Sequence, residues 1–189
     1  MKRTNVEALV AQAKGGDRKA FGDLVEIHQA ALYRAAHRMA GHTEAAEAAT
    51  QDAFVQAYRS LRKFEGRSSF STWLYAILVR KVADGRRDAG RAQEARSLDE
   101  GPAVHEDMRR AAAPGPAEAL QGKELAELAE GAMMRLPRDQ RAALVLVAQE
   151  GLKYSEAAET LGCSEGTVAW RVWNARRLMR EMLREQGAL

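Results

Sequence analysis

The segment that most constrains this chain is strongly amphipathic and lies near the C-terminus, where Leu161 to Arg177 read LGCSEGTVAWRVWNARR. Gly162 favours the end of one helix, and Ser164 favours the start of the next, with its hydroxyl reaching the amide of Gly166 or Thr167. The spacing therefore predicts two helices joined by a tight turn.

The second helix of this pair has two faces of different chemistry. Apolar side chains recur at intervals of 4, 3, 4 and 3 and form one stripe that we expect to face a core, namely Val168, Val172, Ala175, Met179 and Met182. Trp170 lies about 200° and Arg177 about 180° round the helix from Val168. Exposed tryptophans usually mark a contact surface, and the alternative is that they pack on a neighbouring helix while the arginines are solvated. A helix-turn-helix with such a face fits the major groove of DNA.

The rest of the chain also favours helices. Alanine, leucine, glutamate and arginine are abundant, and runs of alternating β-branched or aromatic residues are missing. We expect an all-α protein, with helices over 5–14 (N-cap Asn5), from Asp17 to Gly41, from Thr43 to Phe64 and from Ser69 or Ser71 into 86–91. In the C-terminal part we expect helices from Ala117, over 138–150 and over 154–161.

Periodicity disappears from Gln93 to Pro116, where three prolines and two glycines stand among alanines and acids. We therefore expect two small helical domains, 1–91 and 117–189, joined by a flexible acidic linker over 92–116, which extends to about 80 Å at most. Residues 1–98 carry a net charge of +6, residues 99–134 −5 and residues 135–189 +2. Basic ends are compatible with nucleic acid, although most charged faces are simply solvated.

The sequence lacks the residues that metal-binding, nucleotide-hydrolysing and other enzymatic functions require. Cys163 is the single cysteine, the four histidines have no ligand spacing, and no phosphate loop or nucleophile–base pair is present. We expect no cofactor, no metal and no enzymatic activity. The longest apolar run, 142–148, is too short to span a bilayer, and the N-terminus has no signal-peptide core, which favours the cytoplasm.

Two blocks of sequence resemble bacterial RNA polymerase sigma factors of the extracytoplasmic-function (ECF) class. LPRDQR (136–141), EGLKYSEAA (150–158) and Gly166-Thr167-Val168 resemble region 4, which binds the −35 promoter element. Residues 45–58 and SFSTWLY (69–75) resemble region 2, which binds core RNA polymerase and the −10 element. The resemblance implies promoter-specific transcription initiation, with core polymerase and promoter DNA as partners and an anti-sigma factor as a probable inhibitor.

The resemblance also implies site residues. The −35 set is Ser164, Glu165, Gly166, Thr167, Ala169, Trp170, Arg171, Trp173, Asn174, Arg176 and Arg177. The −10 set is Phe64, Arg67, Ser68, Ser69 and Phe70 around a flipped base, with Arg80, Lys81, Arg86 and Arg87 along the phosphates. The polymerase-binding set is Gln51, Asp52, Val55 and Gln56, with Asp52 as a solvated acid the competing interpretation. Linker acids Asp99, Glu100, Glu106 and Asp107 fit either RNA mimicry or disorder.

The sequence departs from the family pattern at three positions. Ala169 and Trp170 stand where a small polar residue and a lysine or arginine are frequent, and Arg80 stands where asparagine is common. We therefore carry over no promoter sequence, and Trp170 is a candidate for contact with a thymine methyl or a sugar. The rival hypothesis is a helix-turn-helix regulator without a polymerase role. That hypothesis leaves the N-terminal half unexplained and lacks a dimerisation helix.

Overall fold

All regular structure is helical in residues 3–96 and 118–188, the parts of the chain that this computed structural model describes. The first domain contains α1 (Arg3–Lys14), α2 (Arg18–Ala40), α3 (Thr43–Ser60), the 3₁₀ turn η1 (Leu61–Lys63) and α4 (Phe70–Arg96). The second contains α5 (Glu118–Met134), α6 (Arg138–Leu144), the π turn η2 (Val145–Gln149), α7 (Tyr154–Leu161) and α8 (Glu165–Glu185). The all-α prediction is confirmed. No helix within these ranges has the length and apolarity needed to cross a membrane.

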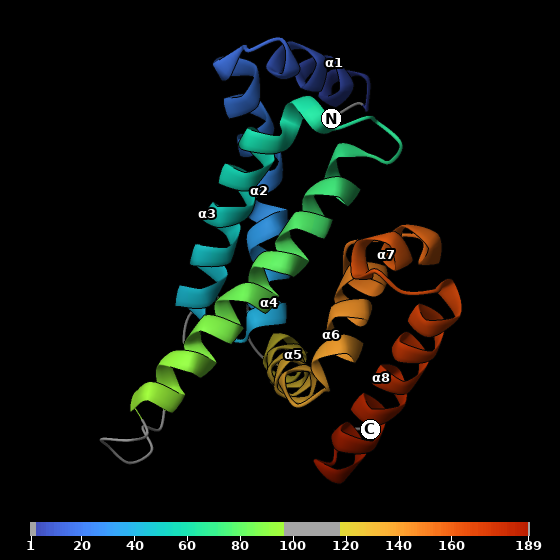
Figure 1. Ribbon diagram of the computed structural model, residues 1–189. Coiled ribbons are helices and arrows are strands. Elements are labelled where there is room, and N and C mark those ends of the chain that lie inside the picture. The colour runs from blue at the N-terminus through green and yellow to red at the C-terminus, as the bar shows by residue number, and fades with distance from the viewer. Residues whose placement is uncertain (1–2, 97–117, 189) are drawn as a thin grey trace.

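The first domain is a bundle in which α2, α3 and α4 run side by side and α1 lies across one end (Figure 1). The buried side of α3 consists of alanines at helical spacing, Ala46, Ala49, Ala53 and Ala57, each at most 6% exposed. Small side chains let α2 and α4 approach α3 closely, so most of the apolar volume comes from those neighbours, for example Leu24, Leu74 and Leu78. The polar side of α3 is left in solvent.

Most helix ends lie where the sequence predicted them. Asp17 caps α2 by accepting from the amides of Lys19 and Ala20, and Gly41 ends the helix with φ 93°. Two predictions were wrong. Helix α1 already begins at Arg3, so Asn5 lies inside it and is not the N-cap. Helix α4 runs on to Arg96, past the expected helix end in 86–91, and alanine, arginine and glutamine in this stretch favour helix. The linker acids lie outside the described residues.

The predicted continuous helix over 138–150 is interrupted. From Val145 each backbone hydrogen bond spans five residues instead of the four of an α-helix. The Glu150 amide, for example, donates to the Val145 carbonyl at 3.1 Å. Val145 and Leu146, neighbours in sequence, are both fully buried in this wider turn. The predicted helix rests on the regular α-helical spacing of about 100° per residue. A single wider turn does not change that pattern enough to be recognised, so the π turn was not predicted.

The two domains pack against each other in the described residues. Helix α4 contacts α7, and α2 contacts α6 and η2 (Figure 1). Buried apolar residues from both domains form one contiguous cluster. At its edge the Tyr75 hydroxyl donates a hydrogen bond to the Glu150 carboxylate. Burial, and next the Glu150 carboxylate, raise the pKa of Tyr75 far above its ordinary value, so the donating hydroxyl persists throughout the physiological range.

The Tyr75–Glu150 hydrogen bond gives a direct test of this packing. Tyr75→Phe removes the hydroxyl and leaves the partly buried Glu150 carboxylate without this donor, so we expect the free energy of unfolding to fall by about 1–3 kcal/mol. Tyr58→Phe is the matched control, because the Tyr58 ring is 47% exposed on the far side of the bundle. A double-mutant cycle of Tyr75→Phe with Glu150→Gln in urea melts measures the coupling, and additive effects would contradict the contact.

Candidate nucleic-acid interface

Helix α8 is fixed in rotation by its apolar stripe. Val168, Val172 and Ala175 are at most 1% exposed, and Met179 and Met182 pack against the same core with partial exposure. Helices α5, α6 and α7 supply the surface on which the stripe lies. The predicted core face of this helix is confirmed, and the opposite side is therefore presented to solvent.

The outer face of α8, which we define as Glu165, Gly166, Ala169, Trp170, Trp173, Arg176, Arg177 and Arg180, is exposed throughout. Trp170 and Trp173 expose 56% and 61% of their surface. The Arg177 guanidinium carbon lies 6.0 Å from the centroid of the Trp173 ring, at the outer limit of a cation–π contact. Neither indole is covered by a neighbouring helix in the described residues, so the packing explanation for the tryptophans is wrong there.

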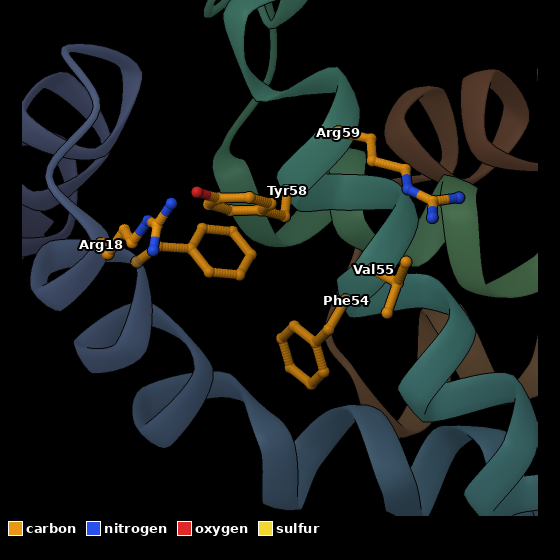
Figure 2. A pocket seen from close by; sticks show the side chains of 6 residues that line it. Arg18, Phe54, Val55, Tyr58 and Arg59 are labelled. Carbon is orange, nitrogen blue, oxygen red and sulfur yellow. The ribbon is translucent and has the colours of Figure 1, made fainter.

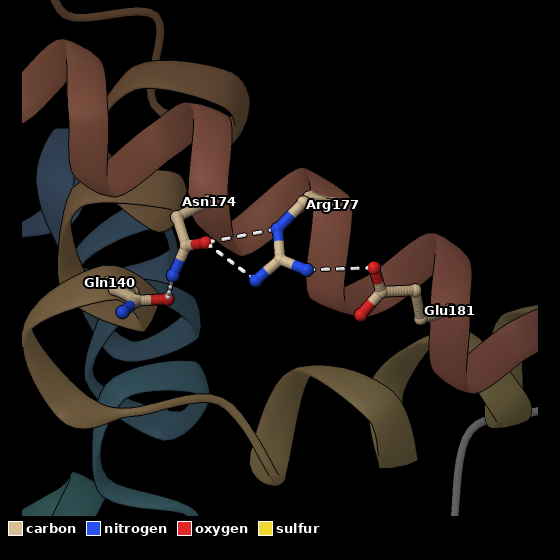
Figure 3. A network of polar contacts seen from close by, with 4 residues as sticks. All are labelled: Gln140, Asn174, Arg177 and Glu181. Carbon is tan, nitrogen blue, oxygen red and sulfur yellow. Dashed lines mark hydrogen bonds and ion pairs between the residues drawn. The ribbon is translucent and has the colours of Figure 1, made fainter.

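Three of the polar residues predicted to contact the −35 element form polar contacts within the domain, namely Arg171, Asn174 and Arg177. The Arg171 side chain is 20% exposed and pairs with Asp139 Oδ2 at 2.8 Å. Asn174 Nδ2 donates to Gln140 Oε1 at 3.0 Å, and its Oδ1 accepts two bonds from Arg177, which also pairs with Glu181 at 2.8 Å (Figure 3). These contacts join α8 to the start of α6. They hold the recognition helix in place and leave Arg171 and Asn174 few atoms for DNA.

The N-terminus of α8 is capped as the sequence predicted. Ser164 Oγ accepts from the Thr167 amide at 3.1 Å and lies 2.8 Å from the Thr167 hydroxyl. The Ser164 hydroxyl is thus engaged by the amide and the hydroxyl of Thr167, and the Thr167 hydroxyl is engaged by Ser164. Glu165, Gly166 and Ala169 remain outward at the first turns, which is the part of a recognition helix that approaches base edges.

The predicted −10 residues divide into a buried floor and an exposed loop. Phe64 and Phe70 are 8% and 5% exposed, and both rings contact Trp73, with centroids 5.0 and 5.7 Å away. The His28 ring contacts Phe70 at a tilted angle, with centroids 5.3 Å apart, and burial lowers the pKa of this histidine. The expectation that Phe64 and Phe70 surround a flipped base does not match this arrangement, because apolar burial turns both rings into the bundle.

The polar −10 residues lie above this floor. Ser69 Oγ caps α4 by accepting from the Thr72 amide at 3.1 Å, and Ser68 beside it is partly exposed. Arg67 is exposed and pairs with Glu65 at 2.6 Å. Arg80 is exposed and Lys81 partly so, further along α4. The side chains of Arg86 and Arg87 lie outside the described part of the chain.

The four residues predicted to bind polymerase lie together on the solvent side of α3: Gln51, Asp52, Val55 and Gln56 are all exposed. An adjacent groove of about 580 Å³ runs between α2 and α3 and is lined by Arg18, Phe21, Phe54, Val55, Tyr58 and Arg59 (Figure 2). Tyr58 is 47% exposed and was not predicted as a site residue. Its position three residues after Val55 puts it on the same face, which is the signal that identifies it.

No group of histidine, cysteine, aspartate and glutamate side chains suited to a metal ion occurs in the described residues. Cys163 is free and partly exposed at the turn between α7 and α8, and Arg171 Nη1 lies 3.6 Å from its Sγ.

Comparisons with known proteins agree with both halves of this arrangement. Residues 24–92 match Sigma-70 region 2, and residues 126–179 match Sigma-70 region 4. The chain is 32% identical to the ECF RNA polymerase sigma-E factor of Haemophilus influenzae, over 92% of each chain. It is 31% identical to the ECF RNA polymerase sigma factor SigW of Bacillus subtilis, over 95% of this chain and 97% of SigW.

Two solved structures are similar over nearly the whole chain. The sigma factor RpoE of Bartonella quintana, in complex with the anti-sigma factor NepR, has a TM-score of 0.73 at 26% identity and covers 88% of this chain and 98% of its own. CnrH, in complex with the cytosolic domain of CnrY, has a TM-score of 0.69 at 28% identity and covers 96% and 98%. The chain therefore belongs to the ECF class of RNA polymerase sigma factors, which are transcription initiation factors.

Proposed function

We propose that this sigma factor binds core polymerase through α3, contacts the −10 element with the loop before α4, and reads the −35 element with the outer face of α8. The observation that carries the proposal is the placement of the DNA-facing surfaces on separate domains, each exposed and each positioned by a buried core. Work with core polymerase also implies that the chain acts in the cytoplasm.

At the −35 element, the outer face of α8 supplies both charge and shape. Arg176 and Arg180 are exposed, and no ion pair is formed by either within the described residues, so they are free to meet phosphates. Arg171 is assigned a positioning role through Asp139. The free amide N–H groups at the start of α8 can donate hydrogen bonds to a phosphate oxygen.

At the −10 element, the loop 65–69 is the surface available for single-stranded DNA. Arg67, Ser68 and Ser69 offer charge and hydroxyl groups, and Arg80 and Lys81 extend the basic surface along α4. Phe64 and Phe70 support this loop from below through Trp73. In this proposal Phe64 and Phe70 do not contact DNA themselves but keep the loop 65–69 in position.

The polymerase surface combines exposed apolar and polar groups. Val55 and Tyr58 are 42% and 47% exposed beside Gln51, Asp52 and Gln56, and an exposed apolar pair flanked by polar side chains is typical of a protein interface. Arg18 and Arg59 border the groove next to them and favour an acidic partner surface.

The packed arrangement of the two domains is too small for both promoter elements at once. A compact chain of this length has a radius of gyration of about 16 Å, hence a diameter of about 40 Å. Positions −10 and −35 lie about 25 base pairs apart, or about 85 Å along the duplex. The domains must therefore separate on the promoter, and the linker together with the domains has the necessary reach.

An anti-sigma factor is the partner that the packed arrangement favours. RpoE was solved with the anti-sigma factor NepR and CnrH with the cytosolic domain of CnrY, and the similarity of both to this chain extends over both domains. A partner that binds only the packed form stabilises it and thereby lowers the fraction able to span a promoter. Addition of such a protein to the purified chain should block its association with polymerase.

The rival function is a helix-turn-helix regulator that acts without polymerase. Co-purification with core polymerase and run-off transcription from selected promoters separate the two. A chain that binds DNA but neither associates with core polymerase nor directs run-off transcripts would overturn the proposal.

A charge on the α3 surface should separate polymerase binding from folding. Val55→Asp places an acid in the centre of the proposed interface, and we expect at least a tenfold loss of affinity for core polymerase with little change in stability. Leu125→Asp is the matched control, since Leu125 is 43% exposed on α5 and Val55 is 42% exposed. Fluorescence titration of the two variants with core polymerase makes the comparison, and equal affinities would contradict the assignment of α3.

The two kinds of arginine on α8 should respond differently to alanine. Arg171→Ala breaks the pair with Asp139, so we expect weaker −35 binding with a stability loss of about 1 kcal/mol and an unchanged salt dependence. Arg176→Ala should leave stability unchanged and reduce the slope of log affinity against log salt by about 1. Holoenzyme titrations at several salt concentrations, with thermal melts of each variant, distinguish these patterns. A reduced salt slope for Arg171→Ala would show that Arg171 contacts a phosphate and would contradict its positioning role.

A further inference from the structure

The part of α8 that approaches base edges offers almost no free hydrogen-bonding side chain. The Ser164 and Thr167 hydroxyls bond each other, Ser164 also accepts from the Thr167 amide, Arg171 is paired with Asp139, and Asn174 is engaged by Gln140 and Arg177. Bidentate readout of guanine or adenine needs an arginine, lysine, asparagine or glutamine that is free to turn outward. From Ser164 to Asn174, the described structure leaves none.

The large side chains that point outward in these turns are apolar. Ala169 is exposed, and Trp170 and Trp173 are the two large side chains, 56% and 61% exposed. An indole has one polar group, an N–H that only donates. Glu165 is exposed there too, but its carboxylate can only accept, from the amino group of cytosine or adenine, and so cannot make the bidentate donor–acceptor contact.

The positive charge around the tryptophans indicates the kind of surface that they contact. Arg176, Arg177 and Arg180 follow on the same face, and Arg177 extends beside the Trp173 ring. An apolar pair continued by cationic side chains is complementary to a groove with apolar groups on its floor and phosphates along its edges. In the major groove, the apolar group on the base edges is the C5 methyl of thymine.

We propose that Trp170 and Trp173 are the specificity-determining residues of α8 and that they select thymine in the −35 element through contact with its C5 methyl group. This inference rests on the proposed function of α8 as the −35 reader. Residues three apart on a helix have Cβ atoms about 5–6 Å apart, and base pairs rise about 3.4 Å, so the pair spans one to two base steps. Selection should therefore fall on two thymines that are adjacent or separated by one base pair.

The test uses holoenzyme assembled from core polymerase and the full chain. Promoters randomised over the −35 element are selected first, and the preferred duplex is then made with deoxyuridine in place of thymidine, which removes the methyl and keeps the base pair. Binding should weaken about fourfold for each contacted methyl, the equivalent of one buried methyl group. Placing 5-methylcytosine at the same position in a thymine-to-cytosine promoter should recover part of the loss.

Variants assign the effect to the indoles. Trp170→Ser and Trp173→Ser should each remove sensitivity to deoxyuridine at one position, whereas Arg176→Ser should weaken all promoters alike and keep that sensitivity. Both tryptophans are exposed, so thermal melts should match the parent chain, and a variant that melts early is replaced by the corresponding phenylalanine, which should retain part of the sensitivity.

Selection without thymine in the −35 element, or deoxyuridine sensitivity that survives Trp170→Ser and Trp173→Ser, would overturn the inference. Holoenzyme that still initiates from −10-dependent promoters in that case would leave the proposed function intact. A chain that never associates with core polymerase would instead remove the proposed function, so the two failures are distinguishable.

Discussion

The packing of the second domain on α4 is the interaction on which the rest of the structure depends. Helix α7 lies on α4, and the buried apolar residues of both domains merge into one cluster, with the Tyr75–Glu150 hydrogen bond at its edge. This contact orients α6 and α7, and α8 packs on them through Val168 and Val172. The direction in which the tryptophans point is thus set relative to the bundle by residues far from them in sequence.

The same packing limits function. Each surface assigned to DNA or polymerase is exposed while the domains are together, so the packed form hides no single binding site in the described residues. The packed form is limited by distance instead. Two DNA-binding surfaces that lie within about 40 Å of each other cannot bind promoter elements about 85 Å apart. We propose that recruitment to polymerase and release from an inhibitor act on one equilibrium between packed and separated domains.

Sequence reasoning recovered what local chemistry determines. The caps at Asp17, Gly41 and Ser164, the core stripe of α8 and the exposure of its tryptophans follow from propensity and helical period, and all are present. It did not recover the pairing of Arg171 with Asp139 or of Asn174 with Gln140, 32 and 34 residues apart. Helical period places a polar side chain at the border of a face but does not say whether a partner from another helix is within reach.

The burial of Phe64 and Phe70 is not indicated by the family resemblance alone. Aromatic residues beside a basic loop suit both base stacking and core packing, and only the position of Trp73 and His28 decides between them. The domain interface was equally beyond prediction, since an apolar helix face shows that something covers it without identifying the neighbour. For α3 the structure adds a residue, because the exposed Tyr58 extends the predicted polymerase-binding surface.

The distance between the domains tests the central claim most directly. Spin labels at Gln29→Cys on α2 and Arg184→Cys on α8, both exposed positions, in a Cys163→Ser chain, report it by pulsed electron paramagnetic resonance. The account predicts one distance below about 40 Å for the free chain and a distance beyond about 60 Å in the complex with core polymerase and promoter DNA. A short distance that persists in a complex competent for transcription would contradict it.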